Sequence, residues 1–147
     1  MRSEDPHAAP ERPRRAVGDL HLIAVPALAE QLSAVRRAVT DWVRALSGSK
    51  DLEDDVGLAV YEALANVADH AYGVAGDGVF DLHAVHGEGM LTVTVADQGR
   101  WKPEAARGSS LRGRGLVMIE RLAAEFEVRR QAGGTQVLMR WPCPAIG

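Results

Sequence analysis

The sequence predicts an α/β sandwich of the α+β class, in which helices cover one face of one mixed, mostly antiparallel sheet. Apolar residues recur every three or four positions between residues 28 and 46, which is typical of an amphipathic helix. Two pairs of alternating segments, 79–85 with 90–97 and 126–130 with 135–141, are joined by short glycine-containing turns that favour hairpins. Two hairpins leave too few strand–helix–strand crossovers for a doubly wound parallel sheet.

The elements follow one another from about Asp19. A strand is expected over residues 20–25, because they are dense in β-forming residues and Pro26 ends them. The first helix carries an apolar stripe that we assign to the core: Leu28, Leu32, Val35, Val39, Trp42 and Leu46. A second helix is predicted from about Asp51 to Tyr72, because acidic residues fill its first turns, where the helix dipole favours them. After a polar stretch over 98–112, a shorter helix is predicted over about 116–124.

Length and composition indicate one domain. The chain has 147 residues, of which 46% are hydrophobic and 25% charged, enough for a single substantial core. Residues 1–18 are rich in proline, arginine and glutamate and are expected to form a disordered arm. We therefore place the folded domain at 19–141 and a C-terminal tail at 142–147.

Several partner classes are disfavoured. The formal net charge of -3 gives no overall basic surface, so direct binding of nucleic acid is not expected. No apolar leader and no long hydrophobic run occur, so no membrane association is expected. The single cysteine, Cys143, is compatible with a reducing compartment. A cytoplasmic location is the expectation.

Glu62 and Asn66 form the first polar motif. They lie about 40° apart on the second helix, beside its apolar stripe. An asparagine carbonyl can ligate a hard cation, and a glutamate can accept a proton from a hydroxyl group. A solvated helix edge is equally compatible with the spacing. Asp69 lies about 20° on the other side of Glu62, and of a metal-site or a solvated position we prefer the solvated one.

Asp97 and Gly99 form the second motif, at the end of an apolar strand. A carboxylate there can accept a hydrogen bond from an exocyclic amine such as that of adenine, and the glycine lets the backbone turn close to a ligand. A simple Asp-x-Gly turn is the alternative. The segment GGT at 133–135, taken alone, predicts only a hairpin turn.

Gly113 and Gly115 form the third motif, directly before the predicted third helix, with Arg112 and Arg114 interleaved. Glycines at a helix N-terminus expose free N–H groups to an anion, and the helix dipole adds to the attraction. A flexible loop followed by a helix cap is the alternative interpretation.

In this order, the motifs resemble the N, G1, G2 and following boxes of the gyrase, heat-shock chaperone, histidine kinase and MutL (GHKL) ATPase superfamily. The form N-x-x-x-H-A-Y, which is Asn66, His70, Ala71 and Tyr72, and the compact length make the chain most similar to bacterial anti-sigma factor serine kinases. The resemblance covers roughly residues 19–141. It implies a Bergerat-type ATP-binding fold, with ATP and Mg²⁺ held between the helices and the sheet.

The resemblance also implies a role for each motif residue. Asn66 would bind Mg²⁺, Glu62 would be the general base, and Asp97 would bind the adenine amine. The remaining cofactor-binding positions would be Gly99, which gives the base room, Thr135, which adds a polar contact near Asp97, Gly113, Gly115 and the Leu116 amide at the phosphates, and Arg112 or Arg114 as charge partners.

The function implied is that of an anti-sigma factor with ATP-dependent serine/threonine kinase activity. Such a protein phosphorylates an anti-anti-sigma antagonist of the STAS type, sequesters a sigma factor and forms a homodimer. Trp101 stands where the G1 pattern D-x-G-x-G has its second glycine, which makes phosphoryl transfer less secure than ATP binding. Two alternatives stay open: a nucleotide-gated binding module without kinase activity, and a detached histidine kinase ATPase domain.

Overall fold

The computed structural model describes residues 18–71, 78–97, 109–131 and 133–144. Its elements are β1 (Leu20–Pro26), α2 (Ala29–Leu46), α3 (Lys50–Asn66), the π-helical turn η2 (Val67–Ala71), β2 (Val79–Gly87), β3 (Met90–Asp97), α5 (Ser109–Leu122), β4 (Glu125–Gln131) and β5 (Gly134–Pro142). No helix in these ranges is both long and apolar enough to cross a membrane.

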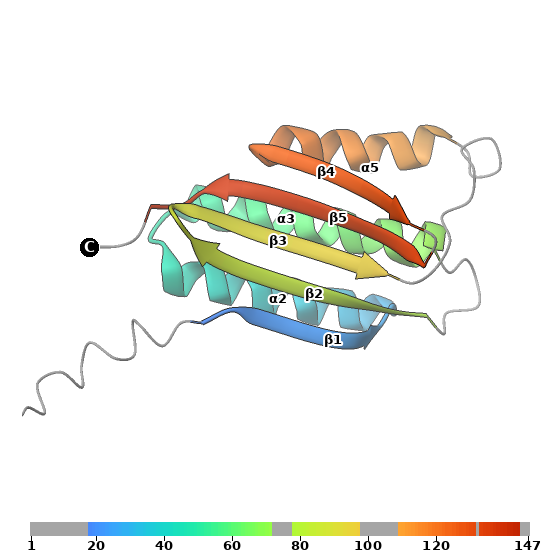
Figure 1. Cartoon of the computed structure of the whole chain (residues 1–147), viewed down its shortest axis with the longest axis horizontal. Coiled ribbons are helices and arrows are strands. Elements are labelled where there is room, and N and C mark those ends of the chain that lie inside the picture. The colour runs from blue at the N-terminus through green and yellow to red at the C-terminus, as the bar shows by residue number, and fades with distance from the viewer. Residues whose placement is uncertain (1–17, 72–77, 98–108, 132, 145–147) are drawn as a thin grey trace, which may run out of the picture.

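The five strands form one sheet in the order β1-β2-β3-β5-β4, and α2, α3 and α5 lie together on one of its faces (Figure 1). This confirms the predicted sandwich of one sheet with helices on one face. The sheet is not mixed, because every pair of neighbouring strands in it is antiparallel. Each of the two hairpins joins neighbouring strands by a short turn, so the joined strands run in opposite directions.

Both hairpins lie where the sequence predicts them. The first turns at Glu88 and Gly89, whose φ angles of 55° and 75° fit a tight two-residue turn that matches the twist of the strands. In the second, Gln131 lies opposite Gly134. Along β3 the buried positions alternate strictly, so one face packs into the core while the other stays open. The last residue on the buried side of β3 is Asp97.

The core lies between the sheet and the helices. The predicted stripe of α2 is buried at Leu32, Val35, Val39 and Trp42, and the Trp42 indole donates a hydrogen bond to the Gly18 carbonyl at 2.7 Å. Leu28 is an exception to the predicted core stripe, since it is 40% exposed. The reason is that it precedes the helix as the N-cap residue, with an extended backbone.

Helix α3 runs antiparallel to α2 and touches it along one line of residues. Glu53 pairs with Arg44, Gly57 approaches Thr40, and Tyr61 lies under the Arg36 guanidinium at 5.7 Å. Each step is four residues along both helices, the spacing at which side chains share a helix face.

The Glu53–Arg44 pair closes the α2–α3 turn. Two hydrogen bonds, 2.5 and 3.3 Å long, join the guanidinium to the two carboxylate oxygens. The hydrogen bond from Arg44 lowers the pKa of Glu53, so the carboxylate stays charged although Glu53 is buried. Ser49 caps the start of α3 by accepting a hydrogen bond from the Leu52 amide.

We expect Gly57→Ala to lower the free energy of unfolding by about 1–3 kcal/mol, because a Cβ at this position would lie 2.7 Å from Thr40 Cγ2. Alanine otherwise favours a helix over glycine by about 1 kcal/mol. Thr40→Ser removes Cγ2 and keeps the hydroxyl that donates to the Arg37 carbonyl. G57A should therefore stabilise a T40S background, as measured by chemical denaturation of all four proteins. A gain in stability from G57A alone would contradict the close approach.

Candidate functional site

The predicted motif segments converge on one end of the molecule. Figure 1 shows the C-terminal ends of α3 and β3, the beginning of α5 and the β4–β5 turn at the same end of the sandwich. These segments carry Asn66, Asp97, Gly113 and Thr135. The antiparallel topology causes this convergence, since β3 ends where β5 begins.

Asn66 lies on the flank of α3 that faces away from α2. It follows Gly57 by nine residues, which corresponds to a rotation of about 180° around the helix. Because α3 packs between α2 and α5, this flank is the one nearer to α5. Glu62 lies about 40° from Asn66 and is half-buried, whereas Asp69 is exposed, as expected.

Asn66 is a buried polar residue with an orphaned group. Its side chain is 5% exposed, and its Nδ2 has no hydrogen-bond partner among the described residues. An unpaired buried amide is costly, so it needs an explanation. A half-turn of the amide exchanges its nitrogen and oxygen, so the position offers a donor or an acceptor to a ligand. This unsatisfied amide is the clearest sign of a binding function in the described part.

The helix after Asn66 differs from the prediction. The expected α-helix to Tyr72 ends at Asn66 and continues as the π-helical turn η2 to Ala71, while Tyr72 lies outside the described residues. The apolar periodicity of the sequence contains no signal for this change, because both helix types bury the same stripe over one turn. Single π-turns are frequent at functional sites, and this one directly follows the orphaned amide.

Asp97 and Thr135 are brought together by strand register. They lie directly opposite each other on β3 and β5, and their exposed fractions are only 5% and 4%. Both belong to the sheet face that the helices cover, because the neighbouring positions Val95 and Val137 on the same face are core residues. A buried carboxylate beside a buried hydroxyl forms a polar corner at the edge of an apolar core.

The glycine motif lies inside a helix, which corrects the prediction that it precedes one. Helix α5 begins at Ser109, not near Leu116, so Arg112, Gly113, Arg114 and Gly115 belong to its first two turns. Serine is favoured at helix starts, and two glycines cost only about 1 kcal/mol each, which weakens a helix without ending it. Only the first four amides of a helix lack an internal partner. The amides at the very start of α5 therefore lack an intrahelical partner, whereas that of Leu116 lies within the helical ladder.

Two predicted features lie outside the described residues. These are Gly99, assigned to the adenine site, and Trp101, at the second glycine position of the G1 pattern. Within the described ranges, no three histidine, cysteine, aspartate or glutamate side chains are grouped so that they could hold a metal ion.

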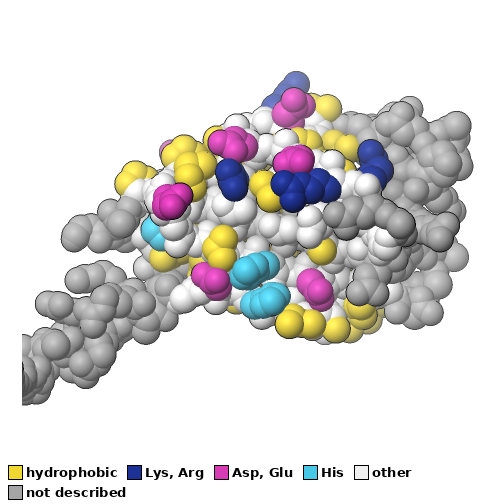
Figure 2. Space-filling model, viewed as in Figure 1, with side chains coloured by type: hydrophobic (Ala, Val, Ile, Leu, Met, Phe, Trp, Pro, Cys, Tyr) yellow, Lys and Arg dark blue, Asp and Glu magenta, His cyan; other side chains and the backbone are white. Residues whose placement is uncertain are grey.

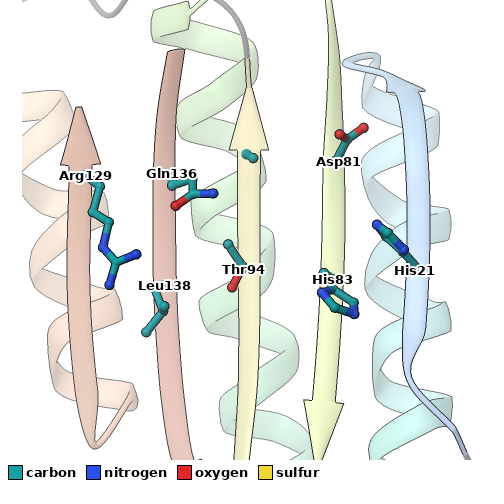
Figure 3. A pocket seen from close by; sticks show the side chains of 8 residues that line it. His21, Asp81, His83, Thr94, Arg129, Gln136 and Leu138 are labelled. Atoms are coloured by element: carbon teal, nitrogen blue, oxygen red, sulfur yellow. The ribbon is translucent and has the colours of Figure 1, made fainter. Parts of the chain in front are cut away.

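A hollow that was not predicted from the sequence lies on the open face of the sheet. It has a volume of about 340 Å³ and spans all five strands, with these lining residues: His21, Asp81, His83, Thr94, Ala96, Arg129, Gln136 and Leu138 (Figure 3). None of them is a predicted site residue. The only sequence signal is the alternation that turns polar side chains outward along the strands.

The charged groups of this hollow already have partners. The Asp81 carboxylate accepts a hydrogen bond from the Ala24 amide at 2.7 Å, and Arg129 pairs with Glu127. The rings of His21 and His83 lie with their centroids 4.5 Å apart and their planes tilted by 30° (Figure 3). Figure 2 shows acidic, basic and histidine side chains gathered on this face of the molecule. This face is an ion-paired surface, so the helix-covered end remains the better candidate for a ligand site.

Comparison with known proteins agrees with the fold and the motifs. Residues 25–141 match the family described as the histidine kinase-like ATPase domain. The chain is 30% identical over 125 residues to the serine-protein kinase RsbW of Halalkalibacterium halodurans, and the match covers 76% of each protein.

Two solved structures share the fold. The RsbU and RsbW domains of Rv1364c from Mycobacterium tuberculosis match with a TM-score of 0.65 and 22% identity, over 86% of this chain and 33% of that one. This chain thus spans about a third of the mycobacterial protein. The SiaB–SiaC complex from Pseudomonas aeruginosa matches with a TM-score of 0.64 and 17% identity, over 91% and 95% of the two chains.

The orphaned amide predicts an unusual effect on stability. We expect Asn66→Leu to raise the free energy of unfolding of the ligand-free protein by about 1 kcal/mol, because leucine has a similar volume and removes an unpaired buried donor. The reverse change at a neighbouring core position, Leu64→Asn, should destabilise strongly and serves as the control. Thermal and chemical denaturation measure both. A clear loss of stability in N66L would show that the amide has a partner in the folded chain.

Proposed function

The chain belongs to the histidine kinase-like ATPase domain family, and on this premise we propose that it is an ATP-dependent protein serine kinase that acts as an anti-sigma factor. The observation that carries the proposal is the buried, unsatisfied Asn66 amide at the end of the molecule where Asp97 and Thr135 are also buried. The match to a serine-protein kinase supports the reaction class.

In this proposal Asp97 selects the adenine base. Its carboxylate can only accept hydrogen bonds, and the exocyclic amine of adenine can only donate them. Thr135, directly opposite on β5, supplies a hydroxyl that can donate or accept next to the same base. Burial of both groups strengthens the hydrogen bonds and raises the cost of a base with the wrong pattern. Gly99 is proposed to give the base room.

Asn66 and the start of α5 are proposed to hold the triphosphate. The orphaned amide fits a Mg²⁺ ligand through its carbonyl oxygen, and Mg²⁺ commonly takes its other ligands from phosphates and water. When bound, the ion would neutralise phosphate charge. The first turn of α5 supplies amides without an intrahelical partner and a favourable dipole, and Arg112 and Arg114 add positive charge. Gly113 and Gly115 lack a Cβ, so they are proposed to let the phosphates approach the backbone of α5.

Glu62 is proposed as the general base. It lies one turn before Asn66 on the same flank of α3, so a substrate serine beside the metal-bound phosphate would come within its reach. Its carboxylate takes the hydroxyl proton, the serine oxygen bonds to the γ-phosphorus, and the bond to the bridging oxygen breaks to release ADP. Half-burial keeps the carboxylate accessible to a protein substrate.

The proposed partners rest on the resemblance to anti-sigma factor serine kinases. We propose an anti-anti-sigma protein of the STAS type as the phosphorylation substrate, a sigma factor as the sequestered partner, and a second copy of the chain in a homodimer. The serine kinase relative supports the first of these. A nucleotide-gated module without kinase activity and a detached histidine kinase domain are the competing functions, and the experiments below separate them.

We expect Asp97→Asn to weaken ATP binding by about tenfold or more, because the amide presents donors as well as an acceptor to the adenine amine and a buried polar mismatch costs at least about 1.4 kcal/mol. Asp81→Asn is the matched control, since it makes the same chemical change on the open face of the sheet. Isothermal titration calorimetry measures both affinities. Equal ATP affinity in D97N and the parent would contradict the assignment of the adenine site.

Glu62→Ala should lower the rate of phosphoryl transfer by about 10²- to 10⁴-fold while the affinity for ATP stays unchanged. Asp69→Ala removes an exposed carboxylate two turns along the same helix and should leave the rate near that of the parent. Transfer of labelled phosphate from ATP to an anti-anti-sigma protein measures the rate. An acid-labile product would identify the histidine kinase alternative, and nucleotide binding without transfer in the parent would identify the binding module.

A further inference from the structure

Strand β4 forms one edge of the sheet. The strand order places β5 on one side of it, and among the described residues no strand pairs with its other side (Figure 1). The backbone N–H and C=O groups along such an edge are available for pairing with another strand. Natural edge strands usually carry charged side chains that discourage pairing with another chain. The positions of the charges on β4 therefore determine with which strand, and in which register, β4 can pair.

The charges on β4 are arranged with opposite signs around its centre. Glu127 and Arg129 project from the open face of the sheet, because their partners in register, Leu138 and Gln136, line the open-face hollow. They form an ion pair of 2.8 Å along the strand, and their side chains are 52% and 50% exposed. Val128 lies between them and turns toward the opposite face, where it packs against the core.

We propose that β4 pairs with β4 of a second copy, antiparallel and with Val128 on the two-fold axis. In this register Glu127 of each copy lies directly opposite Arg129 of the other, so two cross-strand pairs of opposite charge form. The two Val128 side chains meet on the face that the helices cover. The two sheets become one continuous sheet of two copies, held by main-chain hydrogen bonds.

The same charges disfavour the neighbouring registers. A slip of two residues in one direction places Arg129 opposite Arg129 of the second copy. A slip in the other direction places Glu127 opposite Glu127, although it also brings Glu125 opposite Arg129. Like charges directly opposite each other destabilise a strand pair. A slip of one residue would put the helices of the two copies on opposite faces of the sheet, because side chains alternate along a strand. The register with Val128 on the two-fold axis is thus the one that pairs opposite charges without also pairing like charges.

Helix α5 offers apolar surface on the same side of the molecule. It is the helix nearest to β4 in the helical layer, as Figure 1 shows, and it exposes Val117 and Met118 by 44% and 40%. A second copy that pairs with β4 would approach α5 as well. Two exposed apolar side chains beside a free strand edge fit a protein partner better than open solvent.

The edge of β4 is the surface through which the proposed homodimer would form, and this pairing does not require bound ATP. ATP affinity and oligomeric state are measured separately, so the failure of one proposal leaves the other standing. An edge-to-edge contact buries a small area, so we expect a reversible dimer that forms with increasing protein concentration.

The experiment is a charge-swap cycle on the full chain, followed by sedimentation velocity over a concentration series. E127R and R129E each replace two favourable pairs by like charges and should raise the dimer dissociation constant by about tenfold or more. The double variant E127R/R129E recreates both pairs with exchanged signs and should restore the dissociation constant of the parent. Thermal unfolding of each variant checks that the fold is intact.

K50E is the matched control, since it inverts one exposed, ion-paired charge at the α2–α3 turn, away from β4. It should leave the dissociation constant unchanged. A parent protein that stays monomeric at all concentrations would overturn the proposal. So would a dimer that neither single variant weakens, or single variants whose loss the double variant does not restore.

Discussion

The packing of α3 against the middle of the sheet is the constraint on which the rest of the structure depends. Its fully buried stripe (Val56, Ala59, Val60, Ala63 and Leu64) fixes the rotation of the helix about its own axis. Once that rotation is fixed, the two flanks of α3 have different roles. Glu53, Gly57 and Tyr61 lock one flank onto α2 through an ion pair, a close approach and a cation–π contact.

The other flank buries one polar group that has no full compensation among the described residues. Helical geometry places Asn66 on this flank, rotated by about 180° around the helix axis from Gly57. Its Nδ2 has no hydrogen-bond partner in the described part of the chain. Glu62 shares the flank and Asp97 is buried at the same end of the sheet. A chain selected only for stability would fill these positions with apolar residues. Their polarity is the physical link between the fold and a ligand.

The sequence predicted the elements whose burial follows a simple period. The apolar stripe from Leu32 to Trp42 and the alternation in β3 indicate, from local sequence alone, which side of each element is buried. The sandwich and both hairpins could therefore be predicted. The register of Asp97 with Thr135 is not local, but it follows once the hairpins are placed.

The features that the sequence did not predict depend on small energy differences. The π-turn after Asn66 buries the same stripe as an α-helical turn, so periodicity cannot distinguish the two. The start of α5 depends on whether two glycines end a helix or only weaken it, and the surrounding chain decides in favour of the helix. The pairing surface on β4 becomes visible only when the strand order shows which strands form the edges of the sheet.

Binding of an adenine nucleotide at the polar corner formed by Asp97 and Thr135 is the proposal on which the other site assignments depend. The most direct measurement is calorimetric titration of the purified protein with ATP and with GTP, each with and without Mg²⁺. We expect saturable binding of ATP that Mg²⁺ strengthens, and much weaker binding of GTP, because guanine presents a carbonyl where adenine presents the amine that donates a hydrogen bond to Asp97. Equal binding of the two nucleotides, or no binding of ATP in calorimetry and in a second assay, would contradict it.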